Sequence, residues 1–472
     1  MARPNLRPVL RTLTDSAFWR MILPLALPIT LQNLLTSSFQ IVDTLMVGQL
    51  GDTVIASVGI AGQIAFFINI LFYGITAGGS VFIAQFWGAR DRRSIRQIYG
   101  LMLALTLPVC AVFILACSFA APGLIGLFTN EPQLIEIGAQ YLRIACWSYL
   151  GVGLNQAFAV LLRSTEEVKL PMCTGIVSVL LNALANYVLI FGKLGFPALG
   201  VEGAAIATVV SAAAGPILLL GISLWRGNML RAPLREMFSF DAAFAGRYFR
   251  RALPVLLNES LWSMGVLGYN AVFGRMGADN YAALTIFRTI ENLGFVFFIG
   301  LCSACAVLVG KRVGEGRIDD AKRVSAAFLV FEPVLGLCVG ILIFLFAGAI
   351  LSLFNSEPYV HRTAQILLYI YAADIVLRNI PYISVCGIFR AGGDTKTGVK
   401  YDSLCLYGIA LPLVILTGLV LHWPFLIVYT IMLLAEDLPK SWLCLRRYLS
   451  YKWIQPVAGQ PVPLSETEVE SR

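Results

Sequence analysis

Charged residues are scarce in this sequence: Asp, Glu, Lys and Arg make up 13% of its 472 residues, whereas 58% are hydrophobic. A soluble domain usually has about a quarter of its residues charged. The deficit extends along the whole chain, which excludes an ordinary soluble protein of two or three domains. Apolar stretches of about 20 residues, each long enough to cross a bilayer of roughly 30 Å, recur almost from end to end. The sequence therefore predicts a polytopic membrane protein.

The apolar stretches are unbroken and lack the alternating pattern of outer-membrane strands, so we expect an all-α fold of membrane-spanning helices. The first stretch is too long for a signal peptide and no small-residue cleavage site follows it, so we expect it to be retained. Twelve helices are predicted: 18–45, 54–84, 98–121, 135–162, 171–191, 201–225, 248–273, 280–309, 324–354, 358–389, 401–420 and 424–445.

The net charge of +8 is distributed too unevenly to indicate nucleic-acid binding. Of the 35 Lys and Arg, 29 fall on the side of the membrane that holds both termini. Three, Lys193, Arg275 and Arg362, fall on the opposite side. Because positive charge marks the cytoplasmic side, we expect both termini in the cytoplasm. The even number of predicted helices agrees with this topology.

Histidine is scarcer still, with two residues, and the ten cysteines are scattered through apolar segments. Cys302 and Cys305 have CxxC spacing, but they lie in an apolar helix without other ligands nearby, so we interpret them as packing residues. The chain has no HExxH motif, nucleophile–base pair or paired metal motif. We therefore expect neither an enzyme nor a resident cofactor or metal.

The chain also repeats itself at a constant offset, without a gap through two helices and a loop. The matched pairs include Pro28 with Pro254, Leu31 with Leu257, Gly48 with Gly274, Gly74 with Gly300 and Gly88 with Gly314. We expect an N-lobe (1–230), a cytoplasmic linker (231–247), a C-lobe (248–450) and a cytoplasmic tail (451–472). Six helices in each half make the repeats parallel, and two similar bundles suit alternating access.

Several motifs occur in order within this repeat. They are Pro28-(x13)-Val42-Asp43-Thr44-Leu45-Met46-Val47-Gly48, Gln85-(x2)-Gly88, Leu199-Gly-Val-Glu-Gly203 and Arg390-Ala-Gly-Gly-Asp394-Thr-Lys396. With these motifs, residues 15–445 resemble the multidrug and toxic-compound extrusion (MATE) family, including its NorM-like bacterial members. The loop at 163–169 departs from the pattern because it lacks the glycine pair present at Gly392 and Gly393.

The resemblance implies two six-helix lobes and a secondary antiporter that exports organic cations, drugs or toxic metabolites. The coupling ion would be Na⁺ or H⁺. We expect a multi-pass protein of the bacterial inner membrane that acts as a monomer in the lipid bilayer. Its partner would be a small amphipathic or cationic substrate, with no nucleic acid involved.

Asp43 lies toward the outer end of the first predicted helix, and a charge within the bilayer is costly enough to mark a candidate functional residue. Asn182 and Asn186 are four residues apart in the fifth predicted helix and so share one face. A carboxylate beside two amide oxygens offers ligands for a small cation, although burial would also favour a proton on the carboxylate. This trio resembles the N-lobe cation site of NorM-like and DinF-like members, and Thr208 matches a further family position.

Glu259 and Asp374 are the candidates for a cation or substrate site in the C-lobe, where they resemble a Glu and an Asp of NorM-like members. Two nearby acids would repel, which favours uptake of a positive charge. Arg378, one turn beyond Asp374, could instead neutralise it. Arg288 and Glu291 are three residues apart, and we interpret them as a mutual pair. Four residues are candidates for supporting roles: Gln32, Arg288, Glu291 and Arg378.

Three other functions remain open from the sequence. A lipid-linked precursor flippase of the same superfamily would share the architecture, but such proteins usually display many basic residues in the central cavity. Here three Arg residues, Arg143, Arg288 and Arg378, lie inside the predicted helices away from their ends, and the acids offset them. An intramembrane enzyme lacks a recognisable catalytic motif. A channel is less consistent with parallel repeats that carry acids at different positions.

Overall fold

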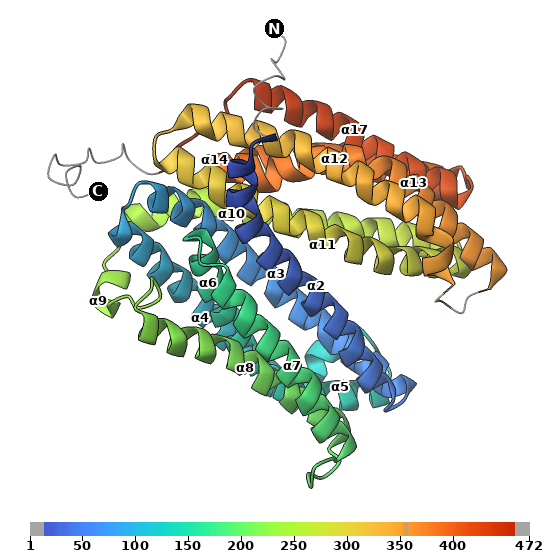
Figure 1. Cartoon of the computed structure of the whole chain (residues 1–472). Coiled ribbons are helices and arrows are strands. Elements are labelled where there is room, and N and C mark those ends of the chain that lie inside the picture. The colour runs from blue at the N-terminus through green and yellow to red at the C-terminus, as the bar shows by residue number, and fades with distance from the viewer. Residues whose placement is uncertain (1–13, 353, 355–356, 458–472) are drawn as a thin grey trace, which may run out of the picture. The chain divides into compact units, whose positions relative to one another are not determined.

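The computed structural model describes residues 14–352, 354 and 357–457 (Figure 1). The N-terminal residues Arg3, Arg7 and Arg11, which count among the 29 basic residues on the side of the termini, lie outside these ranges, as does most of the predicted tail. Within them the structure is helical, and the one β pairing is an isolated bridge between Gly393 and Ile454. The prediction of an all-α fold is confirmed.

The described part of the first half forms seven helices before the connection to the second half. They are α2 (Ser16–Gly48), α3 (Asp52–Gly88), α4 (Arg92–Gly126), α5 (Pro132–Ala145), α6 (Ser148–Ser164), α7 (Lys169–Phe191) and α8 (Gly200–Arg226). The predicted linker contains a short helix, α9 (Leu234–Met237). This linker is packed rather than free, because Arg96 of α4 forms an ion pair with Glu236.

The described part of the second half contains long helices and two helical paths that change winding along their length. The helices are α10 (Ala242–Arg275), α11 (Ala278–Gly314), α12 (Ile318–Leu351), α13 (Pro358–Tyr382), α14 (Arg390–Gly392), α15 (Thr395–Asp402), α16 (Leu411–Ile415) and α17 (Phe425–Leu449). Three segments are π-helical. The first, η1 (Ile383–Phe389), continues α13 into α14; η2 (Ser403–Ala410) links α15 with α16; and η3 (Leu416–Val420) continues α16.

The prediction of one helix over 135–162 is wrong, because α5 and α6 meet there at a bend of 48°. The break falls at Cys146 and Trp147, between Ala145 and Ser148. The apolar pattern could not reveal it, since neither glycine nor proline marks these positions.

Nine described helical segments are long and apolar enough to cross a membrane, or ten when α5 and α6 count as one broken span. The remaining long helices, α10 and α17, carry polar side chains in mid-helix. They include Asn258 and Glu259 in α10 and Glu436, Asp437 and Lys440 in α17. With these two, the described part of the chain contains the twelve predicted helical paths.

The described residues form two compact units that exchange short helical segments. One unit contains residues 27–83 and 92–252, and the other contains 14–26, 84–91 and 253–457. Helix α2 passes from one unit to the other after residue 26, and α10 does so after residue 252. These two positions are equivalent in the repeat, like Pro28 and Pro254. In one unit, Phe18 and Trp19 of α2 pack on rings of α12. In the other, the Tyr248 hydroxyl of α10 donates a hydrogen bond to the Ile75 carbonyl.

Small residues allow helices to approach closely inside the unit that contains α6, α7 and α8. A Cβ added to Gly151 of α6 would lie 2.5 Å from the Ala212 carbonyl oxygen of α8. A Cβ added to Gly203 of α8 would lie 2.6 Å from the Leu189 carbonyl oxygen of α7. Helix interfaces in membranes depend on such close packing, because lipid gives no hydrophobic force between helices.

Replacing Gly151 with Ala should therefore lower the free energy of unfolding by about 1–3 kcal/mol, since the backbone of α8 has to move. Gly221 of α8 is the matched control, because an added Cβ there meets no atom within 4 Å. Thermal unfolding in detergent should show a lower Tm for Gly151→Ala and an unchanged or higher Tm for Gly221→Ala. Equal Tm values for the two variants would contradict this view of the α6–α8 interface.

Candidate functional site

Asp43, Asn182 and Asn186 are in hydrogen-bond contact in the unit that contains residues 27–83. Asn186 Nδ2 of α7 donates to Asp43 Oδ1 of α2 at 2.5 Å and to Asn182 Oδ1 at 3.2 Å. Asp43 lies in the last turns of α2 and is half-buried, whereas Asn186 is fully buried. The two asparagines lie one turn apart on α7, so both reach the same point on α2.

Two hydroxyl residues of α8 extend this group, which we call the Asp43 site (Asp43, Asn182, Asn186, Thr208 and Ser211). Asn182 Nδ2 donates to Ser211 Oγ at 3.2 Å, and Ser211 Oγ donates to the Thr208 carbonyl at 3.0 Å. Thr208 Oγ1 donates to the Ala204 carbonyl at 2.9 Å. Thr208, the further residue suggested by the resemblance, thus lies on α8 and is connected to the asparagines through Ser211.

One buried oxygen of the Asp43 site has no hydrogen-bond partner. Asn186 uses its amide nitrogen for both of its contacts, so its Oδ1 is left buried and without a donor. Buried polar atoms are nearly always partnered, and an exception calls for an ion or another ligand. The orphan oxygen and the carboxylate beside it fit a small cation that prefers oxygen ligands. They fit a protonated Asp43 equally well.

Gln32 lies apart from this site. Its Oε1 accepts a hydrogen bond of 2.7 Å from Arg163 Nη2, at the start of the loop that lacks the glycine pair. Gln32 precedes Asp43 by eleven positions on the same helix, which is about 16 Å along the axis. Its contact with Arg163 therefore belongs to a different level of α2.

The two acids predicted for the C-lobe have different partners. Arg390 Nη2 donates to Glu259 Oε1 at 2.5 Å, and the Arg390 side chain is only 8% exposed. Asp374 is buried on α13, and its side chain contacts the carboxyl group of Asp437 on α17. Neither oxygen of Asp374 has a donor group as partner. A carboxyl–carboxyl contact is a hydrogen bond only when one of the two carries a proton.

The interpretation of Arg288 and Glu291 as a mutual pair is wrong. Arg288 Nη1 donates to Asn270 Oδ1 at 2.5 Å, and Glu291 Oε1 instead accepts from Arg378 Nη1 at 2.9 Å. Arg378 also lies 5.9 Å from the centre of the Tyr371 ring. These contacts connect α11 with α10 through Arg288 and with α13 through Glu291, whereas the predicted pair would have lain on α11 alone.

A polar group around α17 was not predicted from the sequence. We call it the α17 network (Asn258, Tyr269, Asp402, Glu436 and Lys440). Lys440 forms ion pairs with Asp402 and, at 3.8 Å, with Glu436. Asn258 Nδ2 donates to Asp402 Oδ2 at 2.5 Å, and the Tyr269 hydroxyl donates to Glu436 Oε2 at 3.0 Å. These contacts connect α10, α15 and α17 in the half that also holds Glu259.

A signal for this network was present in the sequence. The largely apolar run that begins at Phe425 ends at Ala435, which makes it too short to cross a bilayer. The predicted helix over 424–445 already contained Glu436, Asp437 and Lys440, so these residues belong to the span rather than to its cytoplasmic flank. Glu332 was missed too: it is fully buried on α12, and neither of its carboxyl oxygens has a hydrogen-bond partner.

Removing one member of a buried ion pair costs about 3 kcal/mol or more, because the other charge is left without a partner. Arg390→Met should therefore destabilise the protein strongly, and adding Glu259→Gln should recover a large part of the loss. Thermal unfolding of the two single variants and the double variant measures the interaction between the residues. If the two single effects simply add, the contact between Arg390 and Glu259 contributes nothing to stability.

Known proteins share both the sequence pattern and the fold. The MatE family model matches residues 28–188 and again 254–416, so the two matches begin at the repeat-equivalent prolines Pro28 and Pro254. The Probable multidrug resistance protein NorM of Thermotoga maritima is 26% identical over 440 residues, which cover 92% of each chain. Multidrug and toxin extrusion protein 1 of Xenopus tropicalis is 26% identical over 83% of this chain and 67% of its own length.

Solved structures agree with the fold. A crystal structure of a Vibrio cholerae MATE transporter matches with a TM-score of 0.84 and 19% identity, covering 92% of this chain and 97% of that one. Another, of MATE in the straight conformation, has a TM-score of 0.82 and 20% identity, covering 91% of this chain and 96% of that one. With a family model that matches both halves of the repeat, the chain belongs to the MatE family.

Proposed function

We propose that the protein is a secondary antiporter that exports drugs, organic cations or toxic metabolites in exchange for Na⁺ or H⁺. The observation that carries the proposal is the Asp43 site, where a carboxylate and an unpartnered amide oxygen lie inside a bundle of apolar helices. A charge at such a place is costly and usually has a function. The names of the relatives, which refer to multidrug resistance and toxin extrusion, support an export function.

Coupling in this proposal belongs to Asp43. With Na⁺ bound, Asp43 would supply a carboxylate oxygen and Asn186 its free Oδ1, both hard ligands. With H⁺ bound, the carboxyl group would lose its charge. Either event changes the charge between α2 and α7, which provides differential binding energy for two conformations of the protein.

The second half is proposed to bind the cationic part of the substrate, or a second coupling ion, at Asp374. Among the described acids of its surroundings, Glu259 is paired with Arg390, Glu291 with Arg378, and Asp402 and Glu436 with Lys440. Asp374 and Asp437 contact each other and form no ion pair with a described residue, although the charge of Arg378 acts on both. This pair is therefore a place where a further positive charge would be stabilised, and Glu259 could take part after release of Arg390.

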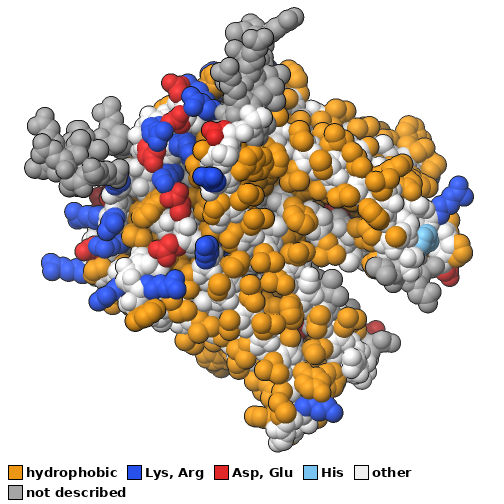
Figure 2. Space-filling model, in the orientation of Figure 1, with side chains coloured by type: hydrophobic (Ala, Val, Ile, Leu, Met, Phe, Trp, Pro, Cys, Tyr) orange, Lys and Arg blue, Asp and Glu red, His pale blue; other side chains and the backbone are white. Residues whose placement is uncertain are grey.

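Both termini are proposed to lie in the cytoplasm of a bacterial cell whose inner membrane holds the protein. On the face drawn in Figure 2, Lys and Arg gather at the helix ends near α9 in one unit and near α14 in the other. Hydrophobic side chains cover the flanks of the helices. Positive charge of this kind marks the cytoplasmic side. We propose a monomer, with lipid around the apolar flanks.

A lipid-linked precursor flippase is not favoured. The two relatives described above carry names of a drug and a toxin exporter. In the second half, Arg378, Arg390 and Lys440 are bound to acids, and Arg288 is bound to Asn270. A basic cavity for a polyphosphate would need those cations free. Catalysis is not part of the proposal, because members of the family are transporters.

Efflux of a fluorescent organic cation from proteoliposomes, under separate Na⁺ and H⁺ gradients, tests the function. Asp43→Asn should abolish gradient-driven transport in a folded protein, because the amide neither ionises nor binds a proton. Asp319→Asn is the matched control, since that carboxylate is 92% exposed at the start of α12. Coupled transport at the original rate in Asp43→Asn would exclude coupling at Asp43, and passive current without saturation would exclude antiport altogether.

Drug binding to purified Glu259→Gln and Asp374→Asn proteins, with and without Na⁺ and at two pH values, tests the second half. Asp374→Asn should weaken cationic substrate binding by about tenfold and reduce its sensitivity to the ion, because a buried charge that attracts the cation is gone. Glu259→Gln should have a smaller effect, since Arg390 already neutralises Glu259. If both variants keep the affinity and ion response of the unmodified protein, these acids are structural.

A further inference from the structure

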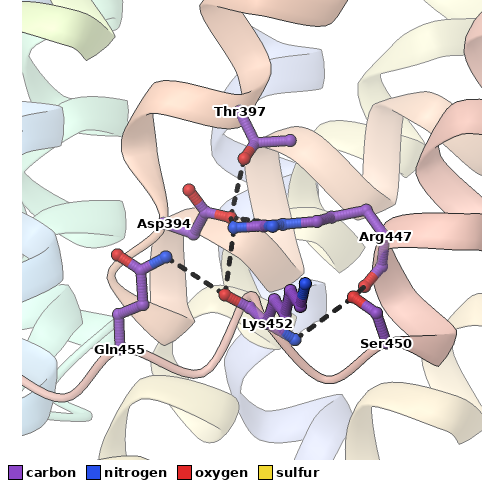
Figure 3. A network of polar contacts seen from close by, with 6 residues as sticks. All are labelled: Asp394, Thr397, Arg447, Ser450, Lys452 and Gln455. Carbon is purple, nitrogen blue, oxygen red and sulfur yellow. Dashed lines mark hydrogen bonds and ion pairs between the residues drawn. The ribbon is translucent and has the colours of Figure 1, made fainter.

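Two motifs that the Asp43 site does not use come together with the end of the described chain. The Gln85-(x2)-Gly88 motif ends α3, and the Gly392-Gly393-Asp394 motif forms the turn between α14 and α15. Residues 450–457, which follow α17 and which we call the strap, lie against both. Figure 3 shows the polar contacts at its centre.

The strap binds the turn through its backbone. The Gln455 amide donates to the Gly392 carbonyl at 2.7 Å, and Gly393 forms the isolated bridge with Ile454. Trp453 is fully buried beside this bridge, and its ring stacks on Tyr448 of α17 at 5.9 Å with an interplanar angle of 9°. Burying a tryptophan stabilises a contact considerably, so these few residues form a firm attachment.

An ion pair fixes the base of the strap. Arg447 of α17 donates to Asp394 Oδ2 through Nε at 2.8 Å and through Nη2 at 2.5 Å (Figure 3). The same Nη2 donates to the Lys452 carbonyl at 3.0 Å, and Thr397 donates to Asp394 at 2.7 Å. Asp394 is almost completely buried, so this charge-assisted contact is protected from water.

Gln85 connects the strap to α3. Its Nε2 donates to the Ala391 carbonyl at 2.8 Å, and its Oε1 accepts from the Val457 amide at 2.7 Å. Gln85 is fully buried, and its backbone contacts Gly314 of α11 so closely that a Cβ on the glycine could not be accommodated. The last turns of α3, residues 84–91, belong to the unit of the second half, although the rest of α3 belongs to the other unit.

The repeat provides an internal comparison for the glycine pair. The equivalent loop of the first half has Glu166 at the position of Gly393, and the two have similar backbones with φ of 68° and 95°. Their amides also donate to equivalent carbonyls, those of Arg163 and Arg390. The turn itself therefore tolerates a side chain.

The strap explains why glycine is needed in the second half. A Cβ on Gly392 would lie 2.5 Å from the Trp453 carbonyl oxygen, and a Cβ on Gly393 would collide with the Gln455 carbonyl. Both contacts come from the strap rather than from the turn. The glycine pair is thus required by the chain that packs on it.

We propose that the strap anchors the end of α3 to the second half of the chain, so that residues 84–91 move with that half during transport. The inference rests on the proposed transport function only for its effect on turnover. Because α3 passes from one unit to the other at residue 84, the firmness of this attachment determines how motion of one unit acts on the other. The strap is thus a positioning element that binds neither substrate nor ion.

Hydrogen–deuterium exchange of the full-length protein tests the attachment without reference to transport. Trp453→Ala should increase exchange in residues 84–91 and 390–394 by about tenfold, because a local opening becomes easier. Lys452→Ala is the matched control, since the Lys452 side chain is exposed and the strap uses only the Lys452 backbone. Unchanged exchange at 84–91 in Trp453→Ala, with the strap itself exposed, would overturn the proposal.

Gly392→Ala gives a second route if Trp453→Ala fails to fold, because it displaces the strap while all strap residues remain. It should raise exchange in residues 84–91 in the same way.

In proteoliposomes, strap variants should lower the turnover severalfold and leave the KM for the exported cation within about twofold, since the Asp43 site is untouched. Faster exchange at 84–91 with unchanged turnover would refute the anchoring role in transport, even if the attachment is real. If the unmodified protein shows no coupled transport, the proposed function fails while the exchange result still stands.

Discussion

Polar groups inside this protein have to find partners within the protein, because hydrocarbon offers none. Much of the second half follows from that constraint. Lys440 forms ion pairs with Asp402 and Glu436. Arg378 is paired with Glu291, and Arg390 is paired with Glu259. The few described groups left without a donor, such as Asn186 Oδ1 and the Asp374 carboxyl oxygens, are consequently the candidates for an exchangeable ion. The proposed function therefore depends on places where pairing is incomplete.

A large part of the fold could be predicted from the sequence, because long apolar runs and a repeat that spans half the chain are direct physical signals. The grouping of Asp43 with Asn182 and Asn186 could also be predicted, because helical spacing puts the two asparagines on one face and the family resemblance places Asp43 beside them. The bend between α5 and α6 could not, because no residue at 146–147 breaks a helix by its own chemistry.

The partners of the C-lobe residues were beyond prediction for a different reason. Spacing along one helix suggested a pair of Arg288 and Glu291. In the structure Arg288 binds Asn270 of α10 instead, and Glu291 binds Arg378 of α13. Contacts between helices depend on packing distances that only the folded chain defines. The strap shows the same limit, because nothing in residues 450–457 indicates that Gln85 binds them.

The exchange of helical segments between the two units bears on how the chain arose and on whether its two halves can fold separately. Residues 14–26 of α2 and the first turns of α10, at repeat-equivalent positions, each pack in the unit of the other half. Two copies of a six-helix protein that exchange their N-terminal segments would form a domain-swapped dimer of this kind. Fusion of two such genes would make the swap permanent. Cutting the chain in its linker would then leave each fragment without a segment that only the other supplies, so the fragments would have to be synthesised together to fold.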